Sequence, residues 1–299
     1  MFRNYSDHTV GEIGRKNAQE PLSKLTFGIE IEFENNHRIT PRISEYDLSE
    51  LFDRLGEGRT YCKRDGSLNN GGCELISEPG TLGYHMHVFR WKNILKAAVQ
   101  NGFRSHDTEN CGMHVHVGRA QLGDSPAQRA IVIRKVMAIT QIFRPELTRF
   151  SRRNLRELDN WAPIPSLPSH VDRHNAEELR EYFAGWSTRV HDHNARYTAV
   201  NVTNGSTVEI RIFRGTAKRD TVIANIQLVN NMFTYAMTHS WEDLAAASFT
   251  DIALCEPYNE IVGYLKNRGL LAADAVVPTL PCSGRTPDFG GRDGVEALA

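Results

Sequence analysis

Three short segments of the chain place ionisable side chains on alternate residues of runs that are otherwise apolar, at 28–33, 111–117 and 208–213. Successive side chains of a strand point to opposite faces, so each segment would present its ionisable groups together on one face. The pairs are Glu30 with Glu32, His114 with His116, and Glu209 with Arg211. Carboxylates, imidazoles and a guanidinium arranged in this way are groups that bind a divalent metal and phosphate.

The carboxylates at Glu30, Glu32 and Glu34 have two explanations. They could form the solvent face of an amphipathic edge strand, which is the commoner explanation for a lone Glu-x-Glu pair. Like charges on one strand face repel, however, and are tolerated only in water or beside a cation that neutralises them. Together with the other two motifs, they are better explained by a bound divalent metal.

The two histidines also have a simpler explanation. His114 and His116 could lie on the surface, or could bind zinc with Cys111 as a thiolate. Cys111 and His114 are three positions apart, so a regular strand directs them to opposite faces and a joint zinc site would need a bulge. A set of carboxylates and imidazoles suits magnesium or manganese with phosphate better than a structural zinc.

Glu209 and Arg211 could form a surface ion pair, although neighbours two apart on one strand seldom neutralise each other well. The planar guanidinium of Arg211 matches a phosphate group, and a neighbouring carboxylate can hold a metal that bridges the same phosphate. Arg214, Gly215 and Thr216 then supply a second cation, a flexible backbone point and a hydroxyl before a predicted helix. The N-terminus of a helix favours anions, so this segment predicts a phosphate site.

Strands and helices must position these residues, and they are predicted in an irregular order. Periodicity predicts strands at 25–34 and 73–77 and around the His114 motif, with a turn at 63–68. Helices are predicted at 46–55, 87–101, 125–143, 176–186, 220–239 and 256–267. This order favours an α+β fold, with a mainly antiparallel sheet and helices packed on it. We expect a catalytic region at 25–270 between a poorly packed segment at 1–24 and a tail at 271–299.

Composition limits the classes of partner. The 299 residues include 35 Lys and Arg against 36 Asp and Glu, which gives no bulk charge to attract nucleic acid or a membrane surface. No apolar run reaches the roughly 18 to 20 residues that span a bilayer. An odd number of cysteines without Cys-x-x-Cys spacing, after a polar N-terminus, predicts a reducing, cytoplasmic compartment. The sequence leaves the oligomeric state open.

Five motifs occur in order along the chain. They are Phe-Gly-Ile-Glu-Ile-Glu at 27–32, Asp-Gly-Ser at 65–67 with Glu-Leu-Ile-Ser-Glu-Pro at 74–79, Cys-Gly-Met-His-Val-His-Val at 111–117, Arg-Tyr at 196–197 with Asn201, and Glu-Ile-Arg-Ile-Phe-Arg-Gly-Thr at 209–216. Together they resemble the amidoligase family of the carboxylate-amine ligase superfamily, which includes glutamine synthetase and glutamate-cysteine ligase. The resemblance spans roughly residues 25–240 and implies a curved antiparallel sheet of the glutamine synthetase catalytic type, with helices on its outer face.

The resemblance also implies an activity. A carboxylate would attack the γ-phosphate of ATP to give an acyl phosphate and ADP, and an amine would then displace phosphate to form an amide or isopeptide bond. This reaction brings anions together, so two Mg²⁺ or Mn²⁺ ions and arginines are needed to neutralise them. One metal would be held by Glu30, His114 and Glu209. The other would be held by Glu32 and Glu74, with Glu78 or Asp65 completing the set.

Further roles follow from the same resemblance. Arg211 would contact the transferred phosphate, and Arg214 or Arg196 would make further phosphate or substrate contacts. Glu78 or Asp65 could accept the proton that the amine loses. The remaining nucleotide or substrate contacts would come from Asn201, His116 and Arg153, the last of which could instead lie at an exposed basic helix end together with Arg152.

The sequence does not name the two substrates. A glutamate-like carboxylate donor follows only by analogy, and the amine could belong to a peptide, a polyamine, a cell-wall fragment or a modified nucleobase. The segment 155–174, which contains Trp161, could form the wall of the acceptor pocket. Two other classes stay open: a metal-dependent hydrolase or phosphoguanidine-type kinase on the same sheet, and a catalytically silent binding protein.

Overall fold

The computed structural model describes residues 2–3, 25–35, 42–68, 71–106, 108 and 110–277. The chain divides into two compact units. Unit 1 comprises Met1–Val117 and Arg211–Ile226, and unit 2 comprises Gly118–Ile210 and Gln227–Ala299. Most of the predicted N-terminal segment and tail lies outside the described residues, and a single catalytic region at 25–270 stays a prediction.

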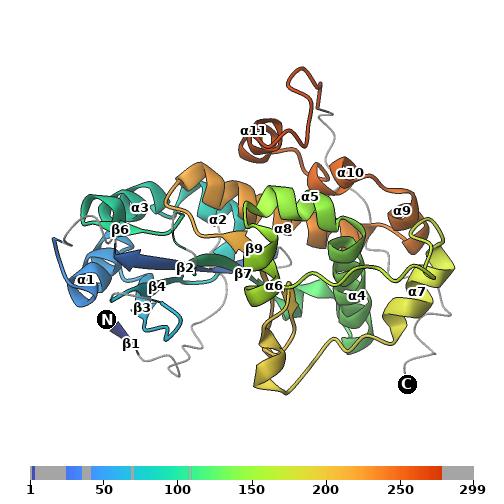
Figure 1. Cartoon of the computed structure of the whole chain (residues 1–299), viewed down its shortest axis with the longest axis horizontal. Helices are drawn as coiled ribbons and strands as arrows, with labels where there is room; N and C mark the ends of the chain where they lie inside the picture. Colours follow the sequence, from blue (N-terminus) through green and yellow to red (C-terminus); the bar gives the residue numbers. More distant parts are fainter. Residues whose placement is uncertain are drawn as a thin grey trace. The chain divides into compact units, whose positions relative to one another are not determined.

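The strands of unit 1 form a mainly antiparallel sheet (Figure 1). Its order is β1 (Phe2–Arg3), β3 (Thr60–Lys63), β4 (Cys73–Ser77), β2 (Thr26–Asn35), β7 (Gly112–Gly118) and β9 (Thr207–Arg214), of which the residues up to Ile210 belong to unit 2. β1 runs parallel to β3, whereas β2 runs antiparallel to β4 and β7. Two short strands, β5 (Gly80–Thr81) and β6 (Phe103–Arg104), also pair with β2. The predicted α+β fold with a mainly antiparallel sheet is confirmed.

The apolar face of β2 forms the centre of the unit 1 core. Its alternate residues Phe27, Ile29, Ile31 and Phe33 are fully buried, as their period-two spacing predicts. Helix α1 (Glu45–Leu55) contacts β3 and β4, and the ring of Phe52 lies 5.8 Å from that of Phe33. Burial of one such side chain stabilises the fold by about 1.5–3 kcal/mol. Because these side chains are buried on one face of β2, the alternating glutamates lie on the opposite face.

The predicted helix at 87–101 is wrong at its start. The structure has two helices here, α2 (Leu82–His87) and α3 (Trp91–Gln100). The side chain of Thr81 caps α2 by accepting a hydrogen bond from Tyr84 N. Nε2 of the fully buried His85 lies 2.8 Å from the carbonyl oxygen of Phe27, which fastens α2 to β2. Burial lowers the pKa of His85 to about 4, although this hydrogen bond acts in the opposite direction.

Unit 2 contains most of the helices of the chain. Ser125 and Gln128 form a capping box that starts α4 (Pro126–Ile142), and α5 (Arg144–Ser151) follows it. The predicted helices at 176–186, 220–239 and 256–267 are confirmed as α7 (Ala176–Ala184), α8 (Arg219–Thr238) and α11 (Asn259–Asn267), of which α8 starts in unit 1. The structure adds the helices α6 (Leu155–Trp161), α9 (Trp241–Ala246) and α10 (Phe249–Ala253), the short 3-10 turns η1 (Arg119–Leu122) and η2 (His193–Arg196), and the strand β8 (Val200–Asn201).

Arg119 holds the loop that joins β8 to β9 within unit 2. Its Nε donates to the carbonyl oxygens of Asn204 and Thr207, at 3.0 and 2.9 Å. Its Nη1 donates to Thr188 O at 2.9 Å, and its Nη2 to Val202 O at 3.0 Å. Burial, together with the charge of Arg189, lowers the pKa of Arg119 to about 10. One side chain therefore satisfies four backbone acceptors of this region.

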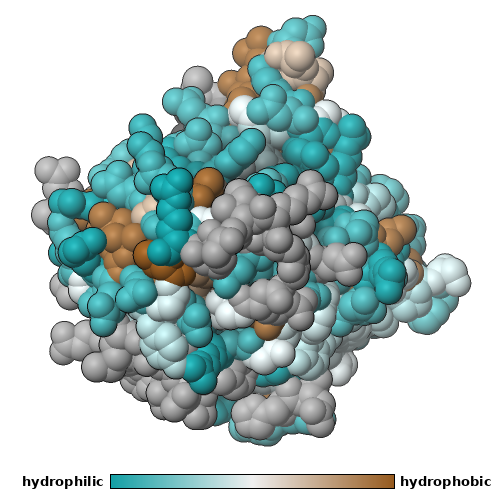
Figure 2. Space-filling model, turned by 60° about the vertical axis from the view of Figure 1, so that its left-hand side comes forward, coloured by the Kyte–Doolittle hydropathy of each residue, from teal (hydrophilic) through white to brown (hydrophobic). Residues whose placement is uncertain are grey.

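The described surface is mostly hydrophilic on the face drawn in Figure 2, where apolar side chains occur in small groups. Large apolar residues with substantial exposure are Tyr46, Val88, Val99, Leu155, Tyr197 and Val276. Among the helices that the structure describes, none combines the length and the apolar composition that crossing a bilayer requires. The cysteines within the described ranges are free, buried thiols, and Cys282 lies outside those ranges.

Candidate metal and phosphate site

The register of three strands aligns the ionisable residues on one face of the unit 1 sheet. Glu30 of β2 lies directly opposite His114 of β7, and Glu32 of β2 lies directly opposite Glu74 of β4. Residues that pair in this way share a face, with Cβ atoms about 4.5–5.5 Å apart. The strands therefore bring four of the predicted metal ligands together.

Two imidazoles contact the carboxylate of Glu30. Its Oε2 lies 3.2 Å from Nδ1 of His114, and its Oε1 lies 3.1 Å from Nε2 of His116. Burial disfavours the charged form of Glu30, but the charge of His116 and hydrogen bonds with both histidines outweigh it and hold the pKa of Glu30 well below its usual range. Glu30 is thus ionised at neutral pH, which is the form that coordinates a metal.

Glu32, Glu74 and His114 form a compact set of buried ligands. Their ligand atoms all lie within 4.8 Å of one another, and the backbone N–H of Gly112 donates to Glu32 Oε2. Burial, the charges of Glu30 and Glu32, a hydrogen bond with Glu30 and the charge of Asp65 raise the pKa of Glu74 well above its usual range. Repulsion between such carboxylates is relieved by a proton or by a cation. The donor set therefore fits a divalent metal.

The solvent-face explanation of the Glu-x-Glu strand is wrong. The exposed fraction of Glu32 is 5% and that of Glu34 is 3%. Carboxylates are seldom buried to this extent unless they are paired or coordinate a metal. Their burial agrees with the metal-binding explanation.

Arg211 lies beside this set, whereas Arg214 does not share its face. Nη1 of Arg211 is 3.5 Å from Nδ1 of His114. Arg214 ends β9 three positions further on, so strand alternation directs its side chain to the opposite face. Arg211 is thus a predicted phosphate contact that lies close to a predicted metal ligand.

The backbone after Arg214 approaches a neighbouring segment closely. The N–H of Gly215 donates to Cys111 O at 3.0 Å. A Cβ atom at position 215 would lie 2.2 Å from Ser105 Oγ and 2.6 Å from Ser105 O. Glycine is therefore required here by the lack of space for any side chain. Thr216 accepts a hydrogen bond from Lys218 N at 3.2 Å, near the start of α8.

Asp65 and Glu78 lie outside the regular strands. Asp65 is in the turn after β3, where its Oδ1 accepts a hydrogen bond from Ser67 N at 2.8 Å. Strand β4 ends at Ser77, so its alternation does not extend to Glu78, whose N–H donates to Arg59 O at 2.9 Å. Asp65 nevertheless contributes to the electrostatics of the ligand set, because its charge raises the pKa of Glu74.

In unit 2, Glu209 is paired with Asn201. The two residues lie opposite each other in the β8–β9 pair, and Asn201 Nδ2 donates to Glu209 Oε2 at 2.6 Å. Glu209 is only 4% exposed, so the surface ion-pair explanation is wrong. The strand alternation of β9 still places Glu209 and Arg211 on one face.

The other predicted nucleotide contacts of unit 2 are on different elements. Arg153 follows α5 and is buried, so an exposed helix end does not describe it. Arg196 donates to Tyr197 Oη at 2.7 Å, and its guanidinium lies 4.8 Å from the Tyr197 ring centroid.

A protein-family model agrees with these motifs. Residues 43–233, more than half of the chain, match the family described as "Putative amidoligase enzyme". The chain belongs to this amidoligase family. No curated protein sequence matches this amidoligase.

Solved structures similar to this amidoligase share little sequence with it. Plasmodium falciparum glutamine synthetase aligns with a TM-score of 0.39 and 9% identity, over 72% of this chain and 51% of that one. The ligase PafA, in its complex with the prokaryotic ubiquitin-like protein Pup, gives 0.35 and 9%, over 75% and 51%. Apo GmaS gives 0.35 and 12%, over 86% and 60%. The amidoligase thus spans only about half to three fifths of these chains.

Sequence reasoning missed one cation on the acidic face of this amidoligase. Lys63 of β3 lies directly opposite Glu74 and is only 8% exposed. The sequence suggested that Lys63 opens a turn, because Asp65 and Gly66 follow it. The alternation of Tyr61 with Lys63 could have identified the strand, but the register that sets Lys63 against Glu74 depends on a pairing that the sequence does not reveal.

Proposed function

We propose that this amidoligase is an ATP-dependent ligase that joins a carboxylate to an amine and releases ADP and phosphate. Family membership supports the reaction class. The observation that carries the proposal is the buried set of Glu32, Glu74 and His114, with the guanidinium of Arg211 next to His114. A metal-ligand set beside an arginine suits phosphoryl transfer, because both neutralise phosphate oxygens.

Two divalent ions fit the ligands as two groups. Glu32 and Glu74 would hold one ion, and Glu30, His114 and Glu209 the other. The assignment of Glu209 rests on strand alternation, which places it on the same face of β9 as Arg211. Bound Mg²⁺ or Mn²⁺ would neutralise negative charge on the phosphate oxygens of the nucleotide. Asn201 would then hold the carboxylate of Glu209 in position through its hydrogen bond.

The residues of the chain would act on the substrates in two steps. In the first, an oxygen of the donor carboxylate bonds to the γ-phosphorus of ATP and the bond to the β-phosphate oxygen breaks, while Arg211 contacts the transferred phosphoryl group. In the second, the amine nitrogen bonds to the acyl carbon and phosphate leaves. Asp65 or Glu78 would accept the amine proton, and His116 would keep Glu30 oriented. Arg153, Arg196 and Arg214 would supply further phosphate or substrate contacts.

The direct test is a screen of amino acids and amines for ADP release in the presence of Mg²⁺ or Mn²⁺. We expect ADP only when a carboxylate and an amine are both present, and a product whose mass equals their sum less one water. Glu32→Gln and Arg211→Lys should each reduce the rate at least about tenfold, whereas Glu50→Gln, an exposed glutamate on α1, should not. AMP and pyrophosphate, or a phosphorylated guanidine, as products would contradict the proposal.

A further inference from the structure

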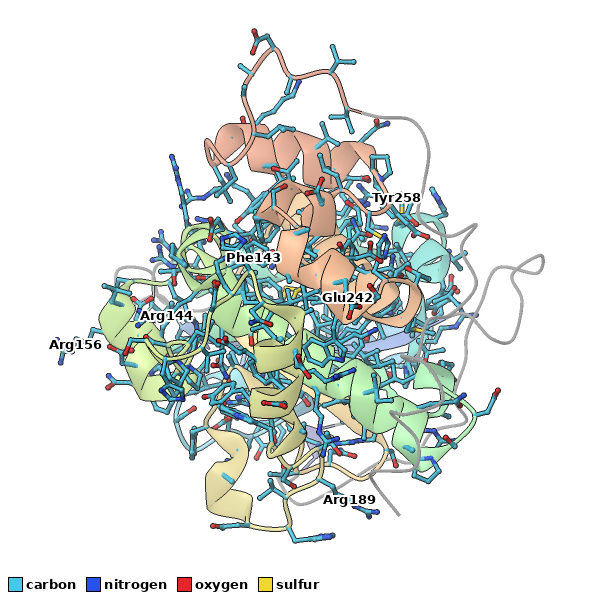
Figure 3. The ribbon with its side chains drawn as sticks, turned by 90° about the vertical axis from the view of Figure 1, so that its right-hand side faces the viewer. Phe143, Arg144, Arg156, Arg189, Glu242 and Tyr258 are labelled. Atoms are coloured by element: carbon cyan, nitrogen blue, oxygen red, sulfur yellow. The ribbon has the colours of Figure 1, made fainter. Side chains whose placement is uncertain are left out.

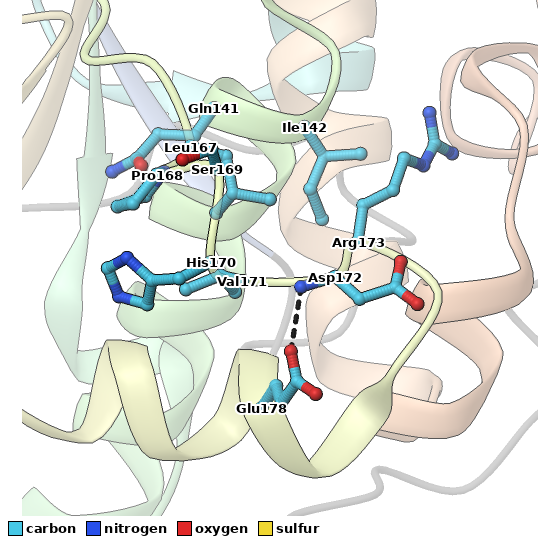
Figure 4. Close-up of a pocket in the computed structure, with 10 residues that line it drawn as sticks. All are labelled: Gln141, Ile142, Leu167, Pro168, Ser169, His170, Val171, Asp172, Arg173 and Glu178. Atoms are coloured by element: carbon cyan, nitrogen blue, oxygen red, sulfur yellow. Dashed lines mark hydrogen bonds between the residues drawn. The ribbon is translucent and has the colours of Figure 1, made fainter.

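The polar groups around a cavity of unit 2 do not converge. This cavity has a volume of about 620 Å³ and lies between the C-terminal end of α4, the segment 167–173 and α7 (Figure 4). Figure 4 shows the Gln141 amide and the Asp172 carboxylate on opposite sides of it. The cavity therefore offers no single point at which a charged ligand would be held, in contrast to a buried cation of unit 1.

This cation is Lys63, on the acidic face of the unit 1 sheet. Lys63 lies directly opposite Glu74 in the β3–β4 pair, and Glu74 lies directly opposite Glu32 in the β4–β2 pair. Residues paired in this way share a face of the sheet, with Cβ atoms about 4.5–5.5 Å apart. Lys63 therefore lies on the same face as the candidate metal ligands, one strand beyond them.

The ammonium group of Lys63 has no polar partner in the part of the chain that the structure describes. The residue is only 8% exposed, yet its Nζ forms no hydrogen bond and no ion pair with any described residue, Glu74 included. The centroid of the Tyr61 ring lies 6.0 Å from Nζ, at the outer limit of a cation–π contact. Lysine is seldom buried unless it is paired, because removal of an ammonium group from water is costly. A bound anion would supply the partner.

Lys63 and Arg211 lie on opposite sides of the candidate metal ligands. The strand order is β3, β4, β2, β7 and β9, with Lys63 on the first of these strands and Arg211 on the last. Four strand spacings, about 19 Å, separate the two backbones, so we expect the two cations to hold different anionic groups. Arg211 is 3.5 Å from Nδ1 of His114 and is the proposed phosphate contact. Lys63 is left for an anionic group of another substrate.

That substrate is the carboxylate donor, the other anion in the proposed reaction. Its reacting carboxylate must approach the γ-phosphate at the metal ligands, on the side of Arg211. The group that reaches Lys63, one strand beyond those ligands, is therefore a second anionic group of the same molecule.

We propose that Lys63 is a specificity-determining residue that binds this second group, so that the donor is a dianion such as a dicarboxylate. The ammonium group of Lys63 donates charge-assisted hydrogen bonds to the second carboxylate while the first lies at the metal ligands. That the dianion is a substrate rests on the ligase function proposed above. Its binding at Lys63 does not depend on turnover.

The test compares glutarate with pentanoate, which has the same chain length but only one carboxylate. In isothermal titration calorimetry with saturating Mn²⁺ and no ATP, wild-type protein should bind glutarate at least tenfold more tightly. Lys63→Gln should reduce this preference at least fivefold and change the affinity for pentanoate less than twofold. Lys63→Arg, which keeps the charge, should retain the preference.

Lys96→Gln is the matched control, because Lys96 is an exposed lysine on α3 in the same unit, and it should leave the preference unchanged. Circular dichroism checks the fold of each variant. If Lys63→Gln does not fold, Lys63→Met, which keeps an apolar stem, replaces it. A lysine that only balances the charge of Glu74 would alter both affinities together. An unchanged preference in the folded variant, or equal binding of the two acids by wild-type protein, overturns the proposal.

The kinetic arm separates this proposal from the ligase function. In the ADP-release assay, Lys63→Gln should raise KM for glutarate, or for the dicarboxylate donor that the screen identifies, at least fivefold and leave KM for ATP unchanged. A rise in KM for ATP alone would assign Lys63 to the nucleotide and overturn the proposal. Glutarate binding that depends on Lys63, without ADP release for any donor and amine of the screen, contradicts the ligase function instead.

Discussion

The surroundings of Glu74 disfavour the ionised form of its carboxyl group. Burial and the neighbouring acids Glu30, Glu32 and Asp65 raise its pKa, and Lys63 is its cross-strand neighbour on the other side. Glu30, by contrast, is kept ionised by its two histidines. The pKa values of these two carboxylates are thus shifted in opposite directions, and a ligand atom of each lies within 4.8 Å of the His114 imidazole. A divalent cation would stabilise such a set of ligands.

Replacement of Glu74 by glutamine should remove a metal ligand with little change in shape. We expect the affinity for Mn²⁺ to fall at least about tenfold, because the amide carries no charge. Isothermal titration calorimetry or electron paramagnetic resonance of free Mn²⁺ would measure it. Glu50→Gln on the exposed side of α1 is the matched control. Equal Mn²⁺ affinity in the two variants would remove Glu74 from the ligand set.

Part of this residue set could be predicted from the sequence. Alternation within one segment was enough to place Glu30 with Glu32 and His114 with His116, because period two is local. The pairing of Glu32 with Glu74 depends on the register between β2 and β4, which the sequence does not specify. For the same reason, Lys63 was missed.

At the scale of elements, the loop between β8 and β9 depends on Arg119. The planar guanidinium reaches four carbonyl oxygens at once, a geometry that an ammonium group cannot reproduce. This loop leads directly into the strand that carries Glu209. Arg119 therefore supports the Asn201–Glu209 pair through the backbone.

The variant Arg119→Lys should destabilise the protein by about 2 kcal/mol, because charge-assisted hydrogen bonds to partly buried backbone carbonyls are lost. Urea unfolding monitored by circular dichroism would measure this. Arg189→Lys is the control, because Arg189 is exposed and lies at the lower edge of Figure 3. If the two variants lose the same stability, the four hydrogen bonds of Arg119 contribute nothing specific.

The contact between α2 and β2 should make stability depend on pH. His85 has a pKa of about 4 in the folded protein against 6.5 ordinarily, so the unfolded chain binds more protons between these values. Its contribution is therefore present above pH 6.5 and is lost as the pH falls towards 4. Between pH 7 and pH 5 the expected loss is about 2 kcal/mol.

Urea unfolding at both pH values would test this with His85→Gln, which removes the titrating group. The loss of stability between pH 7 and pH 5 should be smaller in His85→Gln by about 2 kcal/mol. His87→Gln, on the exposed side of the same helix, should keep the wild-type dependence. Identical pH dependence in all three proteins would show that His85 is protonated without penalty in the folded state.

The elements themselves differ in how far the sequence predicts them. Long periodic helices with a cap, such as α4 after Ser125, were predicted closely. The break between α2 and α3 was missed because the residues between them, Val88 to Arg90, include neither glycine nor proline. The break instead accompanies the burial of two aromatic side chains, Phe89 and Trp91, whose ring centroids lie 4.4 Å apart. Local propensity does not report such contacts.

At the scale of the whole molecule, metal binding should appear as stability. A ligand that binds only the folded state at one hundred times its dissociation constant adds about 2.7 kcal/mol. For a chain of this size that corresponds to a rise in Tm of roughly 5 °C. Calorimetry with saturating Mn²⁺ should show this rise, EDTA should reverse it, and Glu32→Gln should reduce it. A rise of the same size in Glu32→Gln would place the stabilising ion elsewhere.

The close approach at Gly215 has a genetic consequence. Every single-base missense change in a glycine codon introduces a side chain, and the first atom of any side chain would meet Ser105 at 2.2 Å. Relief of this overlap would displace the end of β9, three residues after Arg211. Codon 215 should therefore tolerate no missense allele in a saturation screen for activity, whereas Gly66, where an added Cβ meets nothing within 4 Å, should accept alanine.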